Sequence, residues 1–135
     1  MSALFDDVGP RYLRALLDVT VKQHAAAAAN IANVDTPGYR AQELDFRRAL
    51  AAALQSDAGA VQRTDGAHLA GETSPVAAAL HEVTGLPVRN DGNNVSIDRE
   101  MLHLADASGR YAAAITLLQR EFALLRYAIG GGRQG

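Results

Sequence analysis

The chain has 135 residues, enough for one domain, and it carries no cysteine, which excludes disulfides, thiol catalysis and cysteine-based zinc sites. Its net charge of −2 and its scattered arginines argue against a dedicated nucleic-acid-binding surface. The apolar fraction is 48% but rich in alanine, which favours thin, closely packed helices, and no stretch approaches the ~20 apolar residues of a membrane span.

The beginning of the chain, residues 1–9, is predicted to be a flexible N-terminal tail that closes at Gly9-Pro10. Proline suits the first turn of a helix, so the first helix is expected to begin at Pro10. Asp6 and Asp7 stand where a secretory signal carries positive charge. We therefore expect no cleavable signal peptide.

The first helix is indicated by small or apolar residues whose spacing alternates between four and three. That spacing is typical of a heptad seam. The alanine run from Ala25 to Ala29 has high helix propensity and keeps one face flat, so that a neighbouring helix can approach closely. The seam consists of Leu13, Leu17, Thr20, His24, Ala27, Ile31 and Val34.

A turn is predicted directly after this helix. Pro37 disfavours a helical conformation at Thr36. The sequence from Thr36 to Tyr39 matches a type II turn, with proline at the second position and Gly38 supplying a positive φ at the third. Asn30 and Asn33 lie one helical turn apart just before it, so their amides can either cap free carbonyls or contact a neighbouring chain.

The middle of the chain, residues 48–94, is predicted to be a loop-rich insert because no apolar period persists over residues 56–94. Asp45 is expected to cap a short helix, Phe46 to Gln55, which begins just before the insert and extends into its first residues. Another short helix is expected near Val76 to His81. A small hairpin is expected between Leu86–Arg89 and Val95–Ile97.

The last helix has the strongest periodicity in the chain. Asp98 is predicted as its N-cap, with Ile97 and Leu102 forming a hydrophobic staple across it. Glycines end the helix, and residues 130–135 are predicted to be a flexible C-terminal tail. The predicted seam consists of Met101, Leu104, Ser108, Tyr111, Ile115, Leu118, Phe122, Leu125 and Ile129.

These elements predict a mainly α fold, an antiparallel coiled-coil-like pair of long N- and C-terminal helices around an irregular insert. The helical axial core comprises residues 10–47 and 95–129. Two helices cannot bury both seams completely, so we expect further helices from other subunits. The histidines and carboxylates lack metal-ligand or catalytic spacing, so we expect no enzyme, metal or cofactor.

Several motifs of this sequence resemble those of a known family. Residues 29–39 resemble the N-terminal motif of bacterial flagellar rod and hook proteins. Residues 43–46, 64–69 and 90–101 resemble the proximal rod subunits of the B type.

The resemblance implies a non-enzymatic subunit of the proximal rod, which transmits torque from the membrane ring toward the hook. It implies a periplasmic place in the basal body and export through the flagellar type III channel without a cleaved signal. The implied partners are other rod subunits and membrane-ring or export-gate components at the rod base, with no nucleic acid, membrane span or small-molecule substrate.

The alternative that we keep open is a soluble coiled-coil binding module or secretion adaptor that acts as a closed dimer. On either interpretation the residues expected to mediate assembly are those of the turn motif and the two seams. They are Asn30, Asn33, Thr36, Pro37, Gly38, Tyr39, Leu13, Leu17, Ile31, Leu104, Tyr111, Ile115, Leu118, Phe122 and Leu125.

Overall fold

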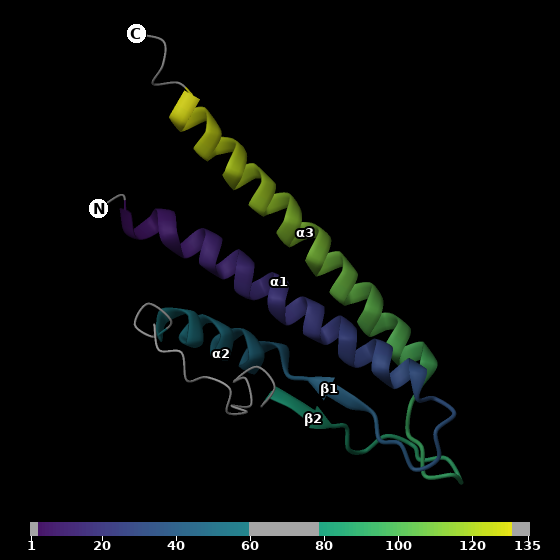
Figure 1. Cartoon of the computed structure of the whole chain (residues 1–135). Helices are drawn as coiled ribbons and strands as arrows, with labels where there is room; N and C mark the ends of the chain where they lie inside the picture. Colours follow the sequence, from purple (N-terminus) through teal and green to yellow (C-terminus); the bar gives the residue numbers. More distant parts are fainter. Residues whose placement is uncertain (1–2, 60–78, 131–135) are drawn as a thin grey trace, which may run out of the picture.

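Two long antiparallel helices dominate the computed structural model, with a third helix and a two-stranded sheet packed against one of them (Figure 1). The structure describes residues 3–59 and 79–130. The mainly α fold with long helices at both ends confirms the predicted fold class. The elements are α1 (Ala3–Ala32), β1 (Gln42–Leu44), α2 (Phe46–Gly59), β2 (Leu80–Glu82) and α3 (Ile97–Gly130).

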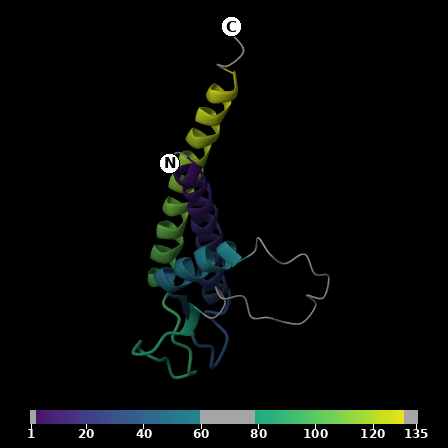
Figure 2. The same cartoon turned by 90° about the vertical axis from the view of Figure 1, so that its left-hand side faces the viewer.

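The helix pair has two different ends. At the closed end, residues 30–45 meet the loop 83–96 and the start of α3. At the open end lie the start of α1 and the last turns of α3, and α3 runs beyond the start of α1 (Figures 1 and 2). In Figure 1 the two helices diverge from the closed end toward the open end.

The first helix begins earlier than the sequence suggested. The flexible tail expected over residues 1–9 is wrong from Ala3 onward, because Pro10 lies inside α1 rather than in its first turn. A proline inside a helix removes one ladder hydrogen bond, but a long packed helix can accommodate that loss with a kink. At the other end the last residues of the predicted tail, 131–135, lie outside the described residues, and Gly130 still belongs to α3.

The end of α1 and the turn that follows are formed by tightening hydrogen bonds. α1 ends at Ala32, and the Asn33 N–H is shared between the carbonyls of Ala29 and Asn30, at 3.1 and 3.2 Å. Such shared bonds close a final turn of 3₁₀ type. The Tyr39 N–H then donates to the Thr36 carbonyl at 3.2 Å, and Gly38 has φ of 73°, which confirms the predicted turn.

The small sheet is antiparallel, but it lies elsewhere than predicted. β1 pairs with β2 in the register Gln42↔Glu82, Glu43↔His81 and Leu44↔Leu80. The hairpin expected between residues 86–89 and 95–97 is wrong, since those residues form no strand. The chain does turn between these two segments, because the Arg89 N–H donates to the Asn93 carbonyl at 2.8 Å.

The loop also bonds to the turn after α1, where the Asn94 N–H donates to the Tyr39 carbonyl at 3.4 Å. The short helix expected near Val76 to His81 lies partly outside the described residues, and His81 itself belongs to β2.

α2 is capped as predicted, with Asp45 Oδ1 accepting from the Arg48 N–H at 3.1 Å. It runs past the predicted end at Gln55 to Gly59. Its buried face packs on α1 and the sheet, where Phe46, Leu50 and Leu54 flank the core. The core cluster consists of Ala15, Val19, Leu44, Ala49, Ala53 and Ala79.

α3 begins one residue before the predicted cap. The Ser96 carbonyl accepts the first helical bond, from the Glu100 N–H at 3.0 Å, so Ser96 occupies the N-cap position predicted for Asp98. The hydrophobic staple is also wrong, because Ile97 is 49% exposed and Leu102 is 71% exposed.

The contact between α1 and α3 is made by small side chains. Ala107 and Ala114, one heptad apart on α3, are fully buried, and Ala27 of α1 is 4% exposed. These alanines stand one position before Ser108 and Ile115 of the predicted seam. The contact face is therefore rotated slightly, and large seam residues such as Met101 and Phe122 remain exposed.

We predict that Val19→Ala lowers the free energy of unfolding by roughly 2 kcal/mol, because it leaves a cavity in the core. Val19 is fully buried, whereas Val21, two residues away on the same helix, is 52% exposed. Val21→Ala is thus a matched control that should change stability by less than about 0.5 kcal/mol. Urea unfolding followed by circular dichroism measures both, and equal losses would contradict the core assignment.

Candidate functional site

The side chain of Asn30 joins three parts of the chain. It is 1% exposed. Its Nδ2 donates to the Gln42 carbonyl at 2.7 Å and to Glu100 Oε2 at 2.9 Å. Its Oδ1 accepts from the Tyr39 hydroxyl at 3.1 Å and from the Gln42 N–H at 2.9 Å. An amide offers two donors and two acceptor sites, so every one of them is used within the chain.

Asn33 closes the end of α1 instead. Its Nδ2 donates to the Ala29 carbonyl at 2.8 Å, and its Oδ1 accepts from the Thr36 hydroxyl at 3.1 Å. Of the two interpretations left open by the sequence, Asn33 therefore fits capping. Asn30 fits neither, because it binds other parts of its own chain.

Asn93 completes the cap of α1 from 60 residues away. It is fully buried, and its Nδ2 donates to the carbonyls of Asn33 at 2.9 Å and Thr36 at 2.8 Å. Its Oδ1 accepts from the Val95 N–H at 2.8 Å. The loop before α3 thus supplies a second donor to two carbonyls of the turn that follows α1, beside the N–H groups of Thr36 and Tyr39.

Asn94 joins β1 to β2 where their ladder ends. It is 4% exposed, its Oδ1 accepts from the Ala41 N–H at 2.6 Å, and its Nδ2 donates to the Val83 carbonyl at 3.1 Å. We call Asn30, Asn93 and Asn94 the asparagine cluster. Sequence reasoning did not propose Asn93, Asn94 or Glu100 as site residues. The only available signal was their place in the motif of residues 90–101.

Charged groups surround the asparagine cluster. Glu100 is 3% exposed and accepts from Asn30, while Arg99 beside it pairs with Glu43 of β1. Burial, and after it the charge of Glu100, raises the pKa of the Tyr39 hydroxyl above its ordinary value of 10.0. Tyr39 is therefore a neutral hydrogen-bond donor at physiological pH.

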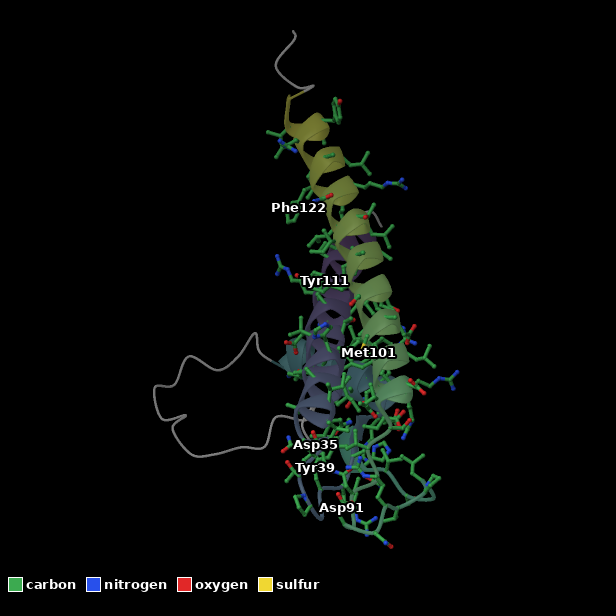
Figure 3. The ribbon with its side chains drawn as sticks, turned by 90° about the vertical axis from the view of Figure 1, so that its right-hand side faces the viewer. Asp35, Tyr39, Asp91, Met101, Tyr111 and Phe122 are labelled. Atoms are coloured by element: carbon green, nitrogen blue, oxygen red, sulfur yellow. The ribbon has the colours of Figure 1, made fainter. Side chains whose placement is uncertain are left out.

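The closed end is also held from its surface. Arg89 donates to the Val34 carbonyl and lies 3.5 Å from Asp91 Oδ2. Asp35, Tyr39 and Asp91 all lie at this end, while Met101, Tyr111 and Phe122 follow one another along α3 (Figure 3).

The open end carries the apolar surface. Along one face of α3, at spacings of three and four residues, the side chains of Phe122, Leu125 and Ile129 are 51%, 46% and 80% exposed. Monomeric proteins rarely expose contiguous apolar patches of this kind unless the patch is an interaction site. Among the predicted seam residues, Leu13 is buried, Leu17, Ile31, Leu104, Ile115 and Leu118 are half-buried, and Tyr111, Phe122 and Leu125 are exposed.

Two shallow apolar grooves flank α1. One of about 340 Å³ runs along its alanine face beside Tyr39, Leu44 and Leu80. The other, of about 270 Å³, lies between α1 and α3 beside Val21 and Tyr111. Such surfaces suit the packing of apolar side chains.

Residues 3–59 and 79–130 lack a metal-binding cluster and a membrane-spanning helix. No group of three metal-ligating side chains occurs there. No helix in those ranges is long and apolar enough to cross a membrane.

Known proteins match this chain over most of its length. Residues 21–40 match the model of a family described as "Flagella basal body rod protein". The chain is 31% identical over 133 residues to the flagellar basal body rod protein FlgB of Salmonella typhimurium, covering 93% of this chain and 96% of that protein. It is 32% identical over 119 residues to FlgB of Escherichia coli, covering 83% and 86%. It is 36% identical over 104 residues to FlgB of Cereibacter sphaeroides, covering 76% and 79%.

We predict that Asn30→Asp destabilises the chain by on the order of 3 kcal/mol at pH 7, because it places a second buried carboxylate against Glu100. Two such carboxyls hold one proton with a raised pKa, so the folded variant binds a proton more tightly than the unfolded one. The difference from wild type should therefore shrink as pH falls from about 7 to about 5. Asn33→Asp, one turn away, should cost less. A pH-independent penalty in chemical unfolding would contradict the pairing of Asn30 with Glu100.

We predict that Tyr39→Phe lowers stability by about 1 kcal/mol near neutral pH through the lost bond to Asn30. Because the folded pKa of Tyr39 is raised, its contribution is complete below pH 10 and is lost as pH rises through the folded value. The wild type should thus lose more stability than the variant as the pH rises above about 10. Tyr127→Phe, at a side chain that is 80% exposed, serves as the control and should follow the wild type.

Proposed function

This chain belongs to the family of flagellar basal body rod proteins, and we propose that it is a structural subunit of the proximal rod, where it transmits torque from the membrane ring toward the hook. The family consists of structural rod proteins rather than enzymes. Its place is the basal body, and its partners include other rod proteins.

The observation that carries the proposal is the exposed apolar face at the open end of α3. Phe122 and Ile129, seven residues apart on one face of this helix of 34 residues, are 51% and 80% exposed. A helix with such a face becomes stable when neighbouring helices cover it. Repeated packing of these helices would build a tube of helices able to carry torsional load.

Further parts of the proposal rest on the family and on the sequence. We propose that the subunit reaches the periplasmic part of the basal body through the flagellar export channel without a cleaved signal peptide. We also propose contacts with membrane-ring or export-gate components at the rod base. The helical axial core would comprise residues 10–47 and 95–129, around an insert of residues 48–94.

The turn motif would act in assembly by setting geometry. Asn30, Asn33, Thr36 and Tyr39 make hydrogen bonds within the chain, so they would position the neighbouring backbone rather than bind another subunit directly. Pro37 and Gly38 are exposed at the closed end and are available to a neighbour.

We predict that Phe122→Asp abolishes incorporation into basal bodies and motility, because a carboxylate in an interface between helices loses its hydration without a partner. Phe122 is 51% exposed, so the variant chain should keep the wild-type circular dichroism spectrum. Gln119→Asp, on the exposed side of the same turn, is the matched control and should swim nearly as well as wild type. Immunoblots of purified basal bodies measure incorporation.

Static light scattering separates this proposal from the closed-dimer adaptor. A rod subunit should be monomeric at micromolar concentration, whereas an adaptor should form a discrete dimer that Phe122→Asp dissociates. Basal bodies that contain the Phe122→Asp variant at the wild-type level would contradict the proposed interface.

A further inference from the structure

We infer that the asparagine cluster keeps the closed end folded in the unassembled chain while the open ends of α1 and α3 separate, so that the helix pair opens about its closed end. This conformational device goes beyond the proposed function. It concerns the isolated chain and does not depend on which assembly the chain joins.

The closed end is cross-linked by bonds between residues far apart in sequence. Asn30 reaches Glu100 across 70 residues, Asn93 reaches Asn33 across 60, and Asn94 reaches the Ala41 N–H across 53. All three asparagines are at most 4% exposed, so an amide released from its partners without access to water would carry a desolvation penalty. The closed end therefore opens as one cooperative unit.

Two glycines bring the loop and the turn into direct contact. The Gly38 N–H donates to the Asp91 carbonyl at 2.8 Å, and both Gly38 and Gly92 have positive φ, 73° and 84°. A Cβ placed on Gly92 would lie only 3.3 Å from Gly38 Cα. At Gly38 itself a Cβ would meet nothing within 4 Å, so the close approach depends on Gly92.

The open end is held differently. Ala107 and Ala114 are buried against α1. Because an alanine side chain is small, its burial removes little apolar surface from water and stabilises the contact only weakly. Beyond them the exposure of α3 rises from a half-buried Leu118 to Ile129 at 80%. Figure 1 shows the two helices diverging toward this end, with the last turns of α3 beyond the start of α1.

Hydrogen exchange of the isolated chain tests this inference, because the device reverses the usual order of protection. The amides of Gly38, Ala41, Gln42 and Val95 stand in loops or in a three-residue strand, where exchange is ordinarily fast. We expect them to exchange at least about tenfold more slowly than the helical amides of residues 118–128. Exchange in residues 118–128 that is as slow as or slower than at these four amides would overturn the inference.

Two variants assign the protection to the asparagine cluster. Asn93→Ala removes the two side-chain bonds that tie the loop before α3 to the carbonyls of Asn33 and Thr36, so protection at the four amides should fall at least about tenfold. Asn90→Ala, at an exposed position in the same loop, should leave it unchanged. Unchanged protection in Asn93→Ala would overturn the assignment, and if that variant does not fold, Gly92→Ala replaces it.

Pulsed electron spin resonance gives an independent measurement, because the chain has no cysteine and each label goes only where a cysteine is introduced. Labels at Asp35→Cys and Asp98→Cys report on the closed end, and labels at Arg14→Cys and Gln119→Cys report on the open end. We expect a narrow distance distribution for the first pair and a broad one for the second. Equal widths would overturn the inference.

Discussion

The side chain of Asn30 holds α1, β1 and the start of α3 in one arrangement because all of its polar atoms are bonded in the interior. Its amide donates to the Gln42 carbonyl and to Glu100, and accepts from Tyr39 and the Gln42 N–H. A buried amide that loses one partner leaves a polar group desolvated without a hydrogen bond, which costs free energy. The four bonds therefore form and break cooperatively. The angle between the two long helices and the path of the chain after the turn both depend on them.

The long helices and the turn were predictable from the sequence because their causes are local. The spacing of apolar residues follows the helical period, Asp45 caps α2 with its own side chain, and Pro37-Gly38 encodes a turn in four consecutive residues. The helix ends were less accurate. Pro10 suggested a later start than α1 has, and Ser96 rather than Asp98 occupies the N-cap position of α3.

The asparagine cluster could not be predicted, because the bonds with which it joins residues 30–41 to residues 93–100 span 53 to 70 positions of the sequence. Nothing next to Asn93 in the sequence indicates that it caps a helix that ended at Ala32. The pairing of β1 with β2 could not be predicted either, because strands of three residues carry too little sequence pattern to indicate a partner. Periodicity located the apolar side of α3, but the face that contacts α1 is centred on Ala107 and Ala114, where small size rather than hydrophobicity decides the fit.

The alanine-rich interior has a calorimetric consequence. Most of the core cluster consists of alanine, with Val19 and Leu44 as its larger members. The heat-capacity change of unfolding scales with the apolar surface that becomes exposed, and alanine side chains contribute little of it. Unfolding of the lone subunit should therefore show a heat-capacity increment below the usual ~12–15 cal/mol/K per residue. Its stability curve should be correspondingly flat, so that cooling and warming change the folded population slowly.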